Sequence, residues 1–498
     1  MRITPISIPA PVARLRVALE RAGQLVAVRG TLPTDVYHIT EDSRKVMGNA
    51  CFVAVRGSAR DGHAFLPGLA EAGAALVICE DPAGTDLPAL VVKDGRIAAA
   101  VAAAAFYDEP AAQLRFVGVT GTNGKTTTVG ILRHLLDEPG APAASIGTLG
   151  VLVGGEGSTI PGGAGLTTPG PIELQRVLRQ LVDLGVRTVA MEVSSHALHQ
   201  GRVLGVHFDA AVFTNLTRDH LDYHGTMEAY FDAKALLVGL LTPTGAAVVN
   251  ADDAVWAKLP PAPRTVRFGT GASVEVRASD VRFTPRGSAW TLHTPAGAAA
   301  VTLPLIGDFN VSNALGAAAA AHALGRDAAT IAHRLGTLPQ VPGRLEVLSE
   351  RPTVLRDYAH TPDALERALV AMRPFTPGKL IVVFGCGGDR DKGKRPLMAN
   401  AARSHADHLV VTSDNPRTED PERILDDICA PLKHGTYDRI EDRRTAIRRA
   451  IELADPAQDV VLLAGKGHET YQIRGTTTFP FDEKAIVHDL LKTHRGSV

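Results

Sequence analysis

The segment RFVGVTGTNGKTTT, residues 115–128, has the residue types and spacing of a loop that binds nucleotide phosphates. Arg115–Val119 is mainly apolar and β-branched, which is typical of a buried strand. The glycine-rich turn Gly121–Gly124 follows, and Lys125 then begins a helical pattern. Glycines let the backbone approach an anion, and the free N–H groups at a helix start point towards it. The pattern therefore predicts a phosphate site.

Two side chains would complete this site. Lys125 would reach the β- and γ-phosphates, and the Thr126 hydroxyl would hold Mg²⁺. The loop departs from the usual G-x-x-x-x-G-K-[ST] pattern, because Val119 stands where that pattern has its first glycine. An ordinary turn between a strand and a helix is the alternative interpretation.

Later in the chain, three residues are candidates for a magnesium site. Glu192 ends the apolar strand pattern TVAME, and His220 lies in NLTRDHLDYHG, after another predicted strand. A lone histidine is also common as a helix cap or as a hydrogen-bonding group. Lys234, in YFDAKALL, could be a solvated helix lysine. Alternatively, a buried and neutral Lys234 amine could react with carbon dioxide to form a carbamate, which is a carboxylate-like metal ligand.

The last third of the chain offers groups that suit a nucleotide and an amino acid. Arg344 could contact phosphate and Asp357 could accept ribose hydroxyls, although each could equally form a local salt bridge. Arg390 and Arg417 have guanidinium groups suited to carboxylates, and Glu469 could accept an ammonium group. These three would suit a zwitterionic ligand, whereas the alternative is solvated loop charge.

Strand and helix patterns alternate along most of the 498-residue chain and predict an α/β protein of about three domains. We expect a smaller α/β domain at 1–111, a central P-loop ATPase domain with a mostly parallel sheet at 112–342, and a doubly wound, Rossmann-like domain at 343–498. Within the central domain, RTVRFG, VEVRAS and SAWTLHT predict a small antiparallel excursion between residues 265 and 306.

The composition argues against nucleic-acid binding and against a membrane span. The 52 basic and 53 acidic residues nearly balance, so we expect no nucleic-acid partner. No stretch has the roughly 18 apolar residues that a membrane span needs. Four scattered cysteines without C-x-x-C spacing are typical of a reduced, cytoplasmic protein.

In this order, the motifs GTNGKTTT, MEVSSHAL, NLTRDHLDYHG, YFDAKALL, VPGRLE, SDNPRTEDP and LLAGKGHETYQ resemble those of the Mur ligases. The resemblance implies catalytic roles for Lys125, His220 and Lys234, and a magnesium site of Thr126, Glu192, His220 and carbamylated Lys234. The implied ATP-binding residues are Gly121, Thr122, Asn123, Gly124, Lys125, Thr126, Thr127, Asn310, Arg344 and Asp357. The implied substrate-binding residues are Glu41, Ser43, Ser58, Ala59, Arg60, Thr167, Thr168, Ser195, Gln200 and Arg202 for the UDP-sugar peptide, and Arg390, Asp414, Asn415, Pro416, Arg417, Gly465 and Glu469 for the incoming amino acid.

The resemblance also implies the reaction. We expect a monomeric cytoplasmic enzyme that uses ATP and Mg²⁺ to add meso-diaminopimelate to UDP-N-acetylmuramoyl-L-alanyl-D-glutamate through an acyl phosphate, in peptidoglycan synthesis. Addition of L-lysine and a folylpolyglutamate synthetase-like ligation are the alternatives among enzymes. A nucleotide switch that binds ATP to gate a partner is the alternative of another class, and the predicted metal residues argue against it.

Overall fold

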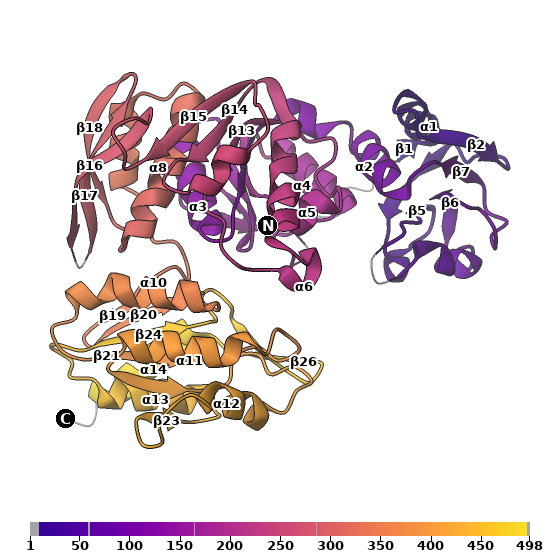
Figure 1. Cartoon of the computed structure of the whole chain (residues 1–498). Helices are drawn as coiled ribbons and strands as arrows, with labels where there is room; N and C mark the ends of the chain where they lie inside the picture. Colours follow the sequence, from indigo (N-terminus) through magenta and orange to yellow (C-terminus); the bar gives the residue numbers. More distant parts are fainter. Residues whose placement is uncertain (1–8, 58–59, 164, 285, 496–498) are drawn as a thin grey trace. The chain divides into compact units, whose positions relative to one another are not determined.

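A computed structural model describes residues 9–57, 60–163, 165–284 and 286–495 of the chain (Figure 1). The chain divides into two compact units. One extends through Val274 and includes Gly316–Arg326, and the other comprises Glu275–Leu315 and the chain from Asp327 onwards.

The first unit begins with a small α/β sheet. Its strands lie in the order β2 (Leu25–Arg29), β7 (Ala89–Val92), β6 (Ala74–Cys79), β5 (Ala50–Val53) and β4 (His38–Thr40). All neighbours are parallel except β2, which pairs antiparallel with β7. The helices α1 (Val12–Arg21) and α2 (Gly95–Phe106) bury their apolar residues against this sheet, and the short strands β1 (Ala10–Pro11) and β3 (Asp35–Val36) pair beside it.

The central sheet follows in the same unit. Its strand order is β11 (Ser158–Ile160), β10 (Gly150–Val153), β9 (Ala143–Gly147), β12 (Thr188–Glu192), β8 (Arg115–Thr120), β13 (Phe208–Phe213), β14 (Leu241–Asn250) and β15 (Arg264–Gly269). From β9 to β15 the pairing is parallel, whereas β10 and β11 are antiparallel. The sheet is therefore mostly parallel, as predicted.

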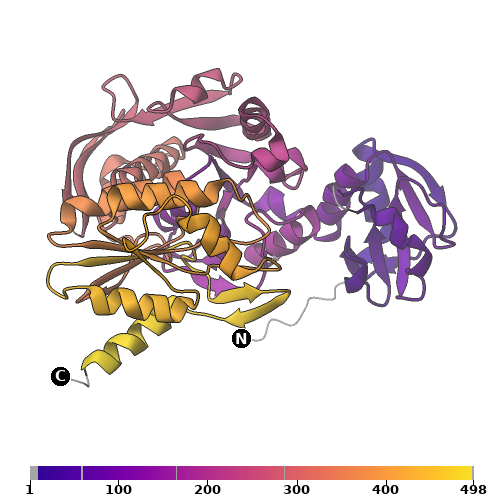
Figure 2. The ribbon, with the colours of Figure 1, turned by 60° about the horizontal axis from the view of Figure 1, so that its bottom comes forward.

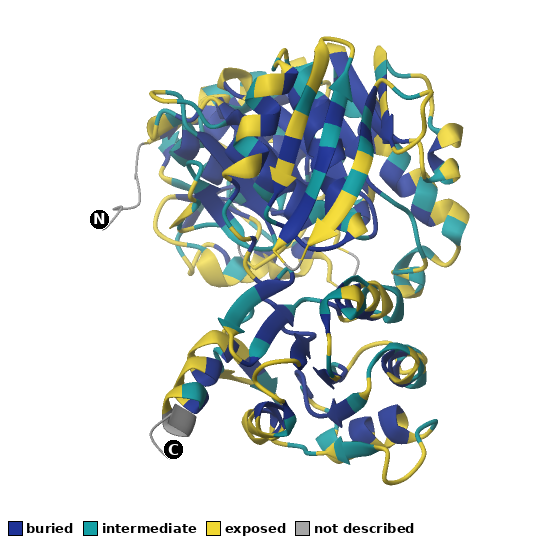
Figure 3. Cartoon of the chain, turned by 90° about the vertical axis from the view of Figure 1, so that its left-hand side faces the viewer, coloured by how far each residue is buried: buried dark blue, intermediate teal, exposed yellow. Residues whose placement is uncertain are grey.

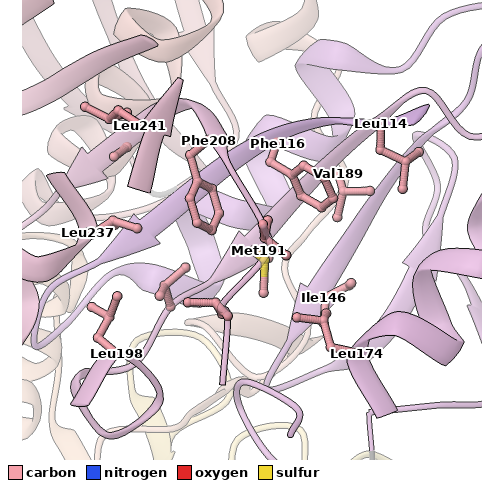
Figure 4. Close-up of a cluster of buried hydrophobic side chains, with 14 of the residues drawn as sticks. Leu114, Phe116, Ile146, Leu174, Val189, Met191, Leu198, Phe208, Leu237 and Leu241 are labelled. Carbon is pink, nitrogen blue, oxygen red and sulfur yellow. The ribbon is translucent and has the colours of Figure 1, made fainter. Parts of the chain in front are cut away.

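The helices of this part are α3 (Lys125–Leu136), α4 (Pro171–Asp183), α5 (Ser195–His199), α6 (Leu221–His224) and α7 (Met227–Ala235). Figure 4 shows the core beneath them, in which Phe116, Met191 and Phe208 come from three neighbouring strands. Register places Glu192 beside Val119 and Phe213 beside Thr120. The three strands consequently end at the same edge of the sheet.

One strand differs from the sequence prediction. RTVRFG does not belong to an antiparallel excursion, because β15 pairs parallel with β14. The excursion consists of β16 (Val276–Thr284), β17 (Gly287–Thr294) and β18 (Gly297–Leu303), which pair antiparallel in the second unit. Helix α8 (Asp308–Ala323) follows, with Asn310 in its first turn, and α9 (Ala328–Gly336) packs against β18.

The C-terminal sheet has the order β19 (Glu346–Glu350), β20 (Thr353–Asp357), β24 (Val460–Ala464), β21 (Leu380–Phe384), β22 (His408–Val411) and β23 (Tyr437–Arg439), and it is parallel except for β19. One face packs against α10 (Pro362–Met372), α11 (Lys394–His405) and α12 (Pro421–Cys429), and the other against α13 (Arg443–Leu453) and α14 (Glu483–Arg495) (Figure 2). Its strands are mostly buried (Figure 3), and a hairpin of β25 (Tyr471–Arg474) and β26 (Thr477–Pro480) follows β24. The doubly wound sheet is confirmed.

Within the described residues, no helix is long and apolar enough to cross a bilayer.

A buried ion pair holds two strand ends of the C-terminal sheet. Arg443 Nε donates to Glu483 Oε1 over 2.8 Å, and both side chains are fully buried. The same guanidinium donates to Ala464 O over 2.9 Å and to Ser413 O over 3.4 Å. Arg443 therefore ties the chain after β22 to the end of β24.

Glu483→Ala should lower the free energy of unfolding by about 3–5 kcal/mol, because it leaves the Arg443 charge buried without its partner. Lys484→Ala, at the neighbouring and mostly exposed position, should cost less than about 1 kcal/mol. Urea denaturation of the two variants measures both values. Equal stability of the two variants would contradict the role given to Arg443.

Candidate active site

Residues that follow β13 form hydrogen bonds with the glycine-rich loop. Thr122 N donates to Asn215 O over 2.7 Å, and Thr214 Oγ1 donates to Asn123 O over 2.7 Å. Gly121 has φ +147°, and a Cβ there would lie 1.9 Å from Thr214 Oγ1, so no other residue fits. Gly124, with φ +86°, caps α3. The predicted strand, glycine turn and helix start are confirmed.

Two lysines converge on one carbonyl of this loop. Lys125 Nζ donates to Gly121 O over 2.9 Å and to Thr122 O over 2.8 Å. Lys234 Nζ donates to Gly121 O over 2.8 Å and lies 4.4 Å from the ring centre of Tyr230. The Lys234 side chain is buried, so the interpretation as a solvated helix lysine is wrong.

The surroundings of Lys234 favour its neutral amine. Burial, followed by the positive charge of Lys125, holds the pKa of Lys234 well below its usual value. A neutral amine is the form that reacts with carbon dioxide, and the carbamate it gives carries oxygen ligands. The local environment therefore fits carbamylation.

Glu192 is buried at the end of β12, next to the loop after β9. Its Oε1 accepts from Thr148 N over 2.8 Å and its Oε2 from Thr148 Oγ1 over 3.2 Å. A Cβ on Gly147 would lie 2.3 Å from Glu192 Oε1, so Gly147 gives the carboxylate its room. Thr148 thus orients a predicted metal ligand.

His220 is the N-cap of α6 and lies among aromatic side chains. Its ring centre is 4.8 Å from that of His196 and 6.1 Å from that of Tyr230. Burial, then the charges of His220 and His224, lowers the pKa of His196 to about 4, so this neighbour is neutral at neutral pH. His220 is exposed enough to meet a ligand.

The donors fit Mg²⁺ bound to a nucleotide. Thr126 and Glu192 offer oxygen atoms, and carbamylated Lys234 would offer more. Across the described parts of the chain, no three His, Cys, Asp or Glu side chains are grouped to enclose a metal ion. Mg²⁺ typically takes few protein ligands and keeps water and phosphate oxygens, so this arrangement suits it.

Four predicted substrate residues near the central sheet, Thr167, Thr168, Gln200 and Arg202, are connected by hydrogen bonds, and Ser195 makes a separate contact. Thr168 Oγ1 donates to Glu192 O over 2.8 Å, and Arg202 Nη1 donates to Thr168 O over 3.1 Å. Arg202 Nη2 also donates to Gln200 Oε1 over 2.7 Å. Thr167 Oγ1 lies 3.3 Å from Thr148 Oγ1, and Ser195 Oγ lies 2.9 Å from His224 Nε2.

The predicted substrate contacts from the N-terminal sheet lie further apart. Glu41 approaches the start of α4, since a Cβ on Gly170, the N-cap of that helix, would lie 2.9 Å from Glu41 Oε1. Ser43 begins a short 3-10 helix, and the exposed Arg60 accepts a backbone hydrogen bond from Gly57. Ser58 and Ala59 lie outside the described residues.

Three predicted nucleotide contacts belong to the second unit. Asn310 is buried, and its Nδ2 donates to Ile306 O over 2.8 Å. The Arg344 guanidinium lies 4.7 Å from the ring centre of Tyr358. Burial raises the pKa of Asp357, and the nearby Arg344 charge opposes this rise.

The predicted amino-acid residues meet at the ends of β21, β22 and β24. Arg417, with φ +53°, donates from Nη1 to Gly388 O over 2.9 Å, and Pro416 O lies against Gly388. Asn415 Nδ2 donates to Glu469 Oε2 over 2.9 Å. A Cβ on Gly465 would lie 3.3 Å from Asp414 Oδ2, and Arg390 lies beside Gly387.

Sequence reasoning missed several residues that position these groups. They are Thr148, Thr214, Asn215, Tyr223, Tyr230 and Lys466. Tyr223 accepts from Gln200 Nε2 over 3.1 Å. Most of them lie within motifs that were recognised, but only the folded contacts show which partner each one holds.

Three family models match consecutive parts of the chain. The Mur ligase family catalytic domain matches residues 35–118, the Mur ligase middle domain 119–321, and the Mur ligase, glutamate ligase domain 343–467.

Full-length relatives and solved structures agree with these matches. UDP-N-acetylmuramoyl-L-alanyl-D-glutamate–2,6-diaminopimelate ligases from Geobacillus thermodenitrificans and Gloeobacter violaceus are each 46% identical, over 97% and 98% of this chain and 100% and 99% of theirs. A solved structure of a ligase of that name is 33% identical with a TM-score of 0.65, covering 94% of this chain and 98% of its own. MurF from Acinetobacter baumannii, 22% identical, shares the fold with a TM-score of 0.69 over 98% of this chain and 100% of its own. The chain therefore belongs to the Mur ligase family.

Proposed function

We propose that this chain joins meso-diaminopimelate to UDP-N-acetylmuramoyl-L-alanyl-D-glutamate at the expense of ATP, in peptidoglycan synthesis. Its relatives of about the same length bear the name of that ligase. The observation that supports the amino-acid assignment most directly is the convergence of Asp414, Asn415, Arg417 and Glu469 at one edge of the C-terminal sheet. A zwitterion with a far carboxylate and a far ammonium group matches these charges.

The chain is an ATP-dependent ligase. In the proposed reaction the γ-phosphoryl group moves from ATP to the D-glutamyl carboxylate, giving ADP and an acyl phosphate. The amine nitrogen then attacks the acyl carbon, an amide bond forms, a proton is lost and phosphate leaves. Lys125 and the N–H groups of the loop Gly121–Thr127 would stabilise charge on the transferred group.

Thr126, Glu192, His220 and carbamylated Lys234 would hold Mg²⁺, which would neutralise phosphate charge when bound. Asn310, Arg344 and Asp357 stay predicted nucleotide contacts. Glu41, Ser43, Arg60, Thr167, Thr168, Ser195, Gln200 and Arg202 stay predicted contacts of the UDP-sugar peptide. We also keep the domain boundaries 1–111, 112–342 and 343–498, the monomeric state and the cytoplasmic location as proposals.

The arginine in the Asp414–Arg417 turn distinguishes the proposal from addition of L-lysine, which lacks a second carboxylate. Arg417 is partly buried, and a partly buried guanidinium left without an anion is costly. Incubating the protein with ATP, Mg²⁺, the UDP-sugar peptide and either amino acid, followed by mass spectrometry of the product, tests the proposal. A lysine product alone would contradict it.

Lys125→Ala should lower the ligation rate by roughly 10²–10³-fold or more, because the transferred phosphoryl group loses a charge contact. The fold should persist, since the Lys125 bonds are to carbonyls at the edge of the loop. Steady-state ADP release measures the rate, and Lys258→Ala, an exposed lysine of the same unit, serves as the control. A rate near wild type would contradict the role of the loop.

Lys234 should carry a carbamate when the folded protein is kept near neutral pH with bicarbonate. ¹³C NMR with labelled bicarbonate should show a carbamate signal that disappears in Lys234→Ala and persists in Lys258→Ala. The Lys234→Ala variant should also be nearly inactive. An active wild-type enzyme without the signal would show that Lys234 works as the free amine.

Arg417→Ala should abolish ligation of diaminopimelate while ATP binding stays at the wild-type level. In the wild type, L-lysine should be disfavoured by about 2–5 kcal/mol, because Arg417 would lose its carboxylate partner. The comparison of kcat/KM for both amino acids at several concentrations gives this value. Arg423→Ala, at an exposed position of α12, is the matched control. Equal use of the two amino acids by wild type would contradict the assignment.

A further inference from the structure

A fully buried lysine lies at the centre of the proposed amino-acid site. Lys466 follows β24, and its side chain is 0% exposed. Its Nζ lies 3.3 Å from Asp414 Oδ1, 3.1 Å from Asn415 Oδ1 and 3.3 Å from Glu469 Oε2. One ammonium group therefore contacts three residues that were assigned to substrate binding.

These contacts leave acceptor atoms available for a ligand. Asn415 Nδ2 also donates to Glu469 Oε2, which fixes the orientation of that carboxylate. In the described structure, no hydrogen bond reaches Asp414 Oδ2 or Glu469 Oε1. Each carboxylate thus has one oxygen bound to Lys466 and another that can accept from a substrate ammonium group.

The charges suggest what the lysine does for selectivity. Two carboxylates that meet at one point repel each other unless a cation lies between them. With Lys466 present, the three charged groups sum to −1, which matches one substrate ammonium group. Without it they would sum to −2 and would attract a ligand whose far end is purely cationic.

We propose that Lys466 is a positioning and selectivity residue for the incoming amino acid, and this rests on the function proposed above. It spaces Asp414 and Glu469 for the ammonium group of diaminopimelate. It also lowers the negative charge of the site, so that the far end of L-lysine, which has an ammonium group and no carboxylate, gains no advantage. Lys466 touches the binding residues, and no chemical step is assigned to it.

The test compares Lys466→Met with wild type on both amino acids. We expect KM for diaminopimelate to rise roughly 30-fold or more, as when one member of a buried charge group is removed, while kcat stays within about threefold. The ratio of kcat/KM for diaminopimelate to that for L-lysine should fall by about tenfold. Lys433→Met, at an exposed position, should change neither value.

A second pair of variants separates charge balance from loss of packing. The double variant Lys466→Met with Glu469→Gln restores a net charge of −1, so its selectivity ratio should return towards that of wild type. The ratio should also be lower in the double variant than in Glu469→Gln alone, because removing Lys466 lowers the net charge from 0 to −1. This second comparison tests the proposal if Lys466→Met alone does not fold. Parallel losses on both amino acids with an unchanged ratio would overturn the proposal, as would unchanged kinetics. Wild type that ligates neither amino acid would instead overturn the proposed function.

Discussion

The carbonyl oxygen of Gly121 accepts hydrogen bonds from two lysines, Lys125 and Lys234. Two ammonium groups on one acceptor repel each other, and the buried one is the group that loses its proton more easily. The crowded loop therefore does two things at once. It places Lys125 at the start of α3, and it lowers the pKa of the buried Lys234, which favours the neutral amine that carbamylation needs.

Both units place their polar groups by the same geometric rule. Parallel strands with common register end at one edge, and the loops beyond that edge are the places where side chains from distant segments meet. Strands β8, β12 and β13 bring together the phosphate loop, Glu192 and Thr214. Strands β21, β22 and β24 bring together Arg390, the Asp414–Arg417 turn and Glu469. The buried Arg443 joins the ends of β22 and β24 through its hydrogen bonds to Ser413 O and Ala464 O.

Local sequence patterns were sufficient for the strand, turn and helix around Lys125, for the doubly wound sheet and for Asn310 at a helix start. They failed where the decisive contact is distant. YFDAKALL has the pattern of a solvated helix, and Lys234 is buried because it reaches Gly121, 113 residues away. RTVRFG alternates as an edge strand of a hairpin would, yet tertiary packing pairs it parallel with β14. Lys466 lies in a recognised motif, but its bond to Asp414 spans 52 residues.

The proposed reaction requires both the UDP-sugar peptide and diaminopimelate for ATP turnover. The direct measurement is ADP release with a panel of amino acids, each with and without UDP-N-acetylmuramoyl-L-alanyl-D-glutamate. We expect rapid ADP release only when the UDP-sugar peptide and diaminopimelate are both present, much slower release with L-lysine, and one amide product for each ADP. ADP release that ignores the UDP-sugar peptide, or that responds equally to L-lysine or L-glutamate, would contradict it.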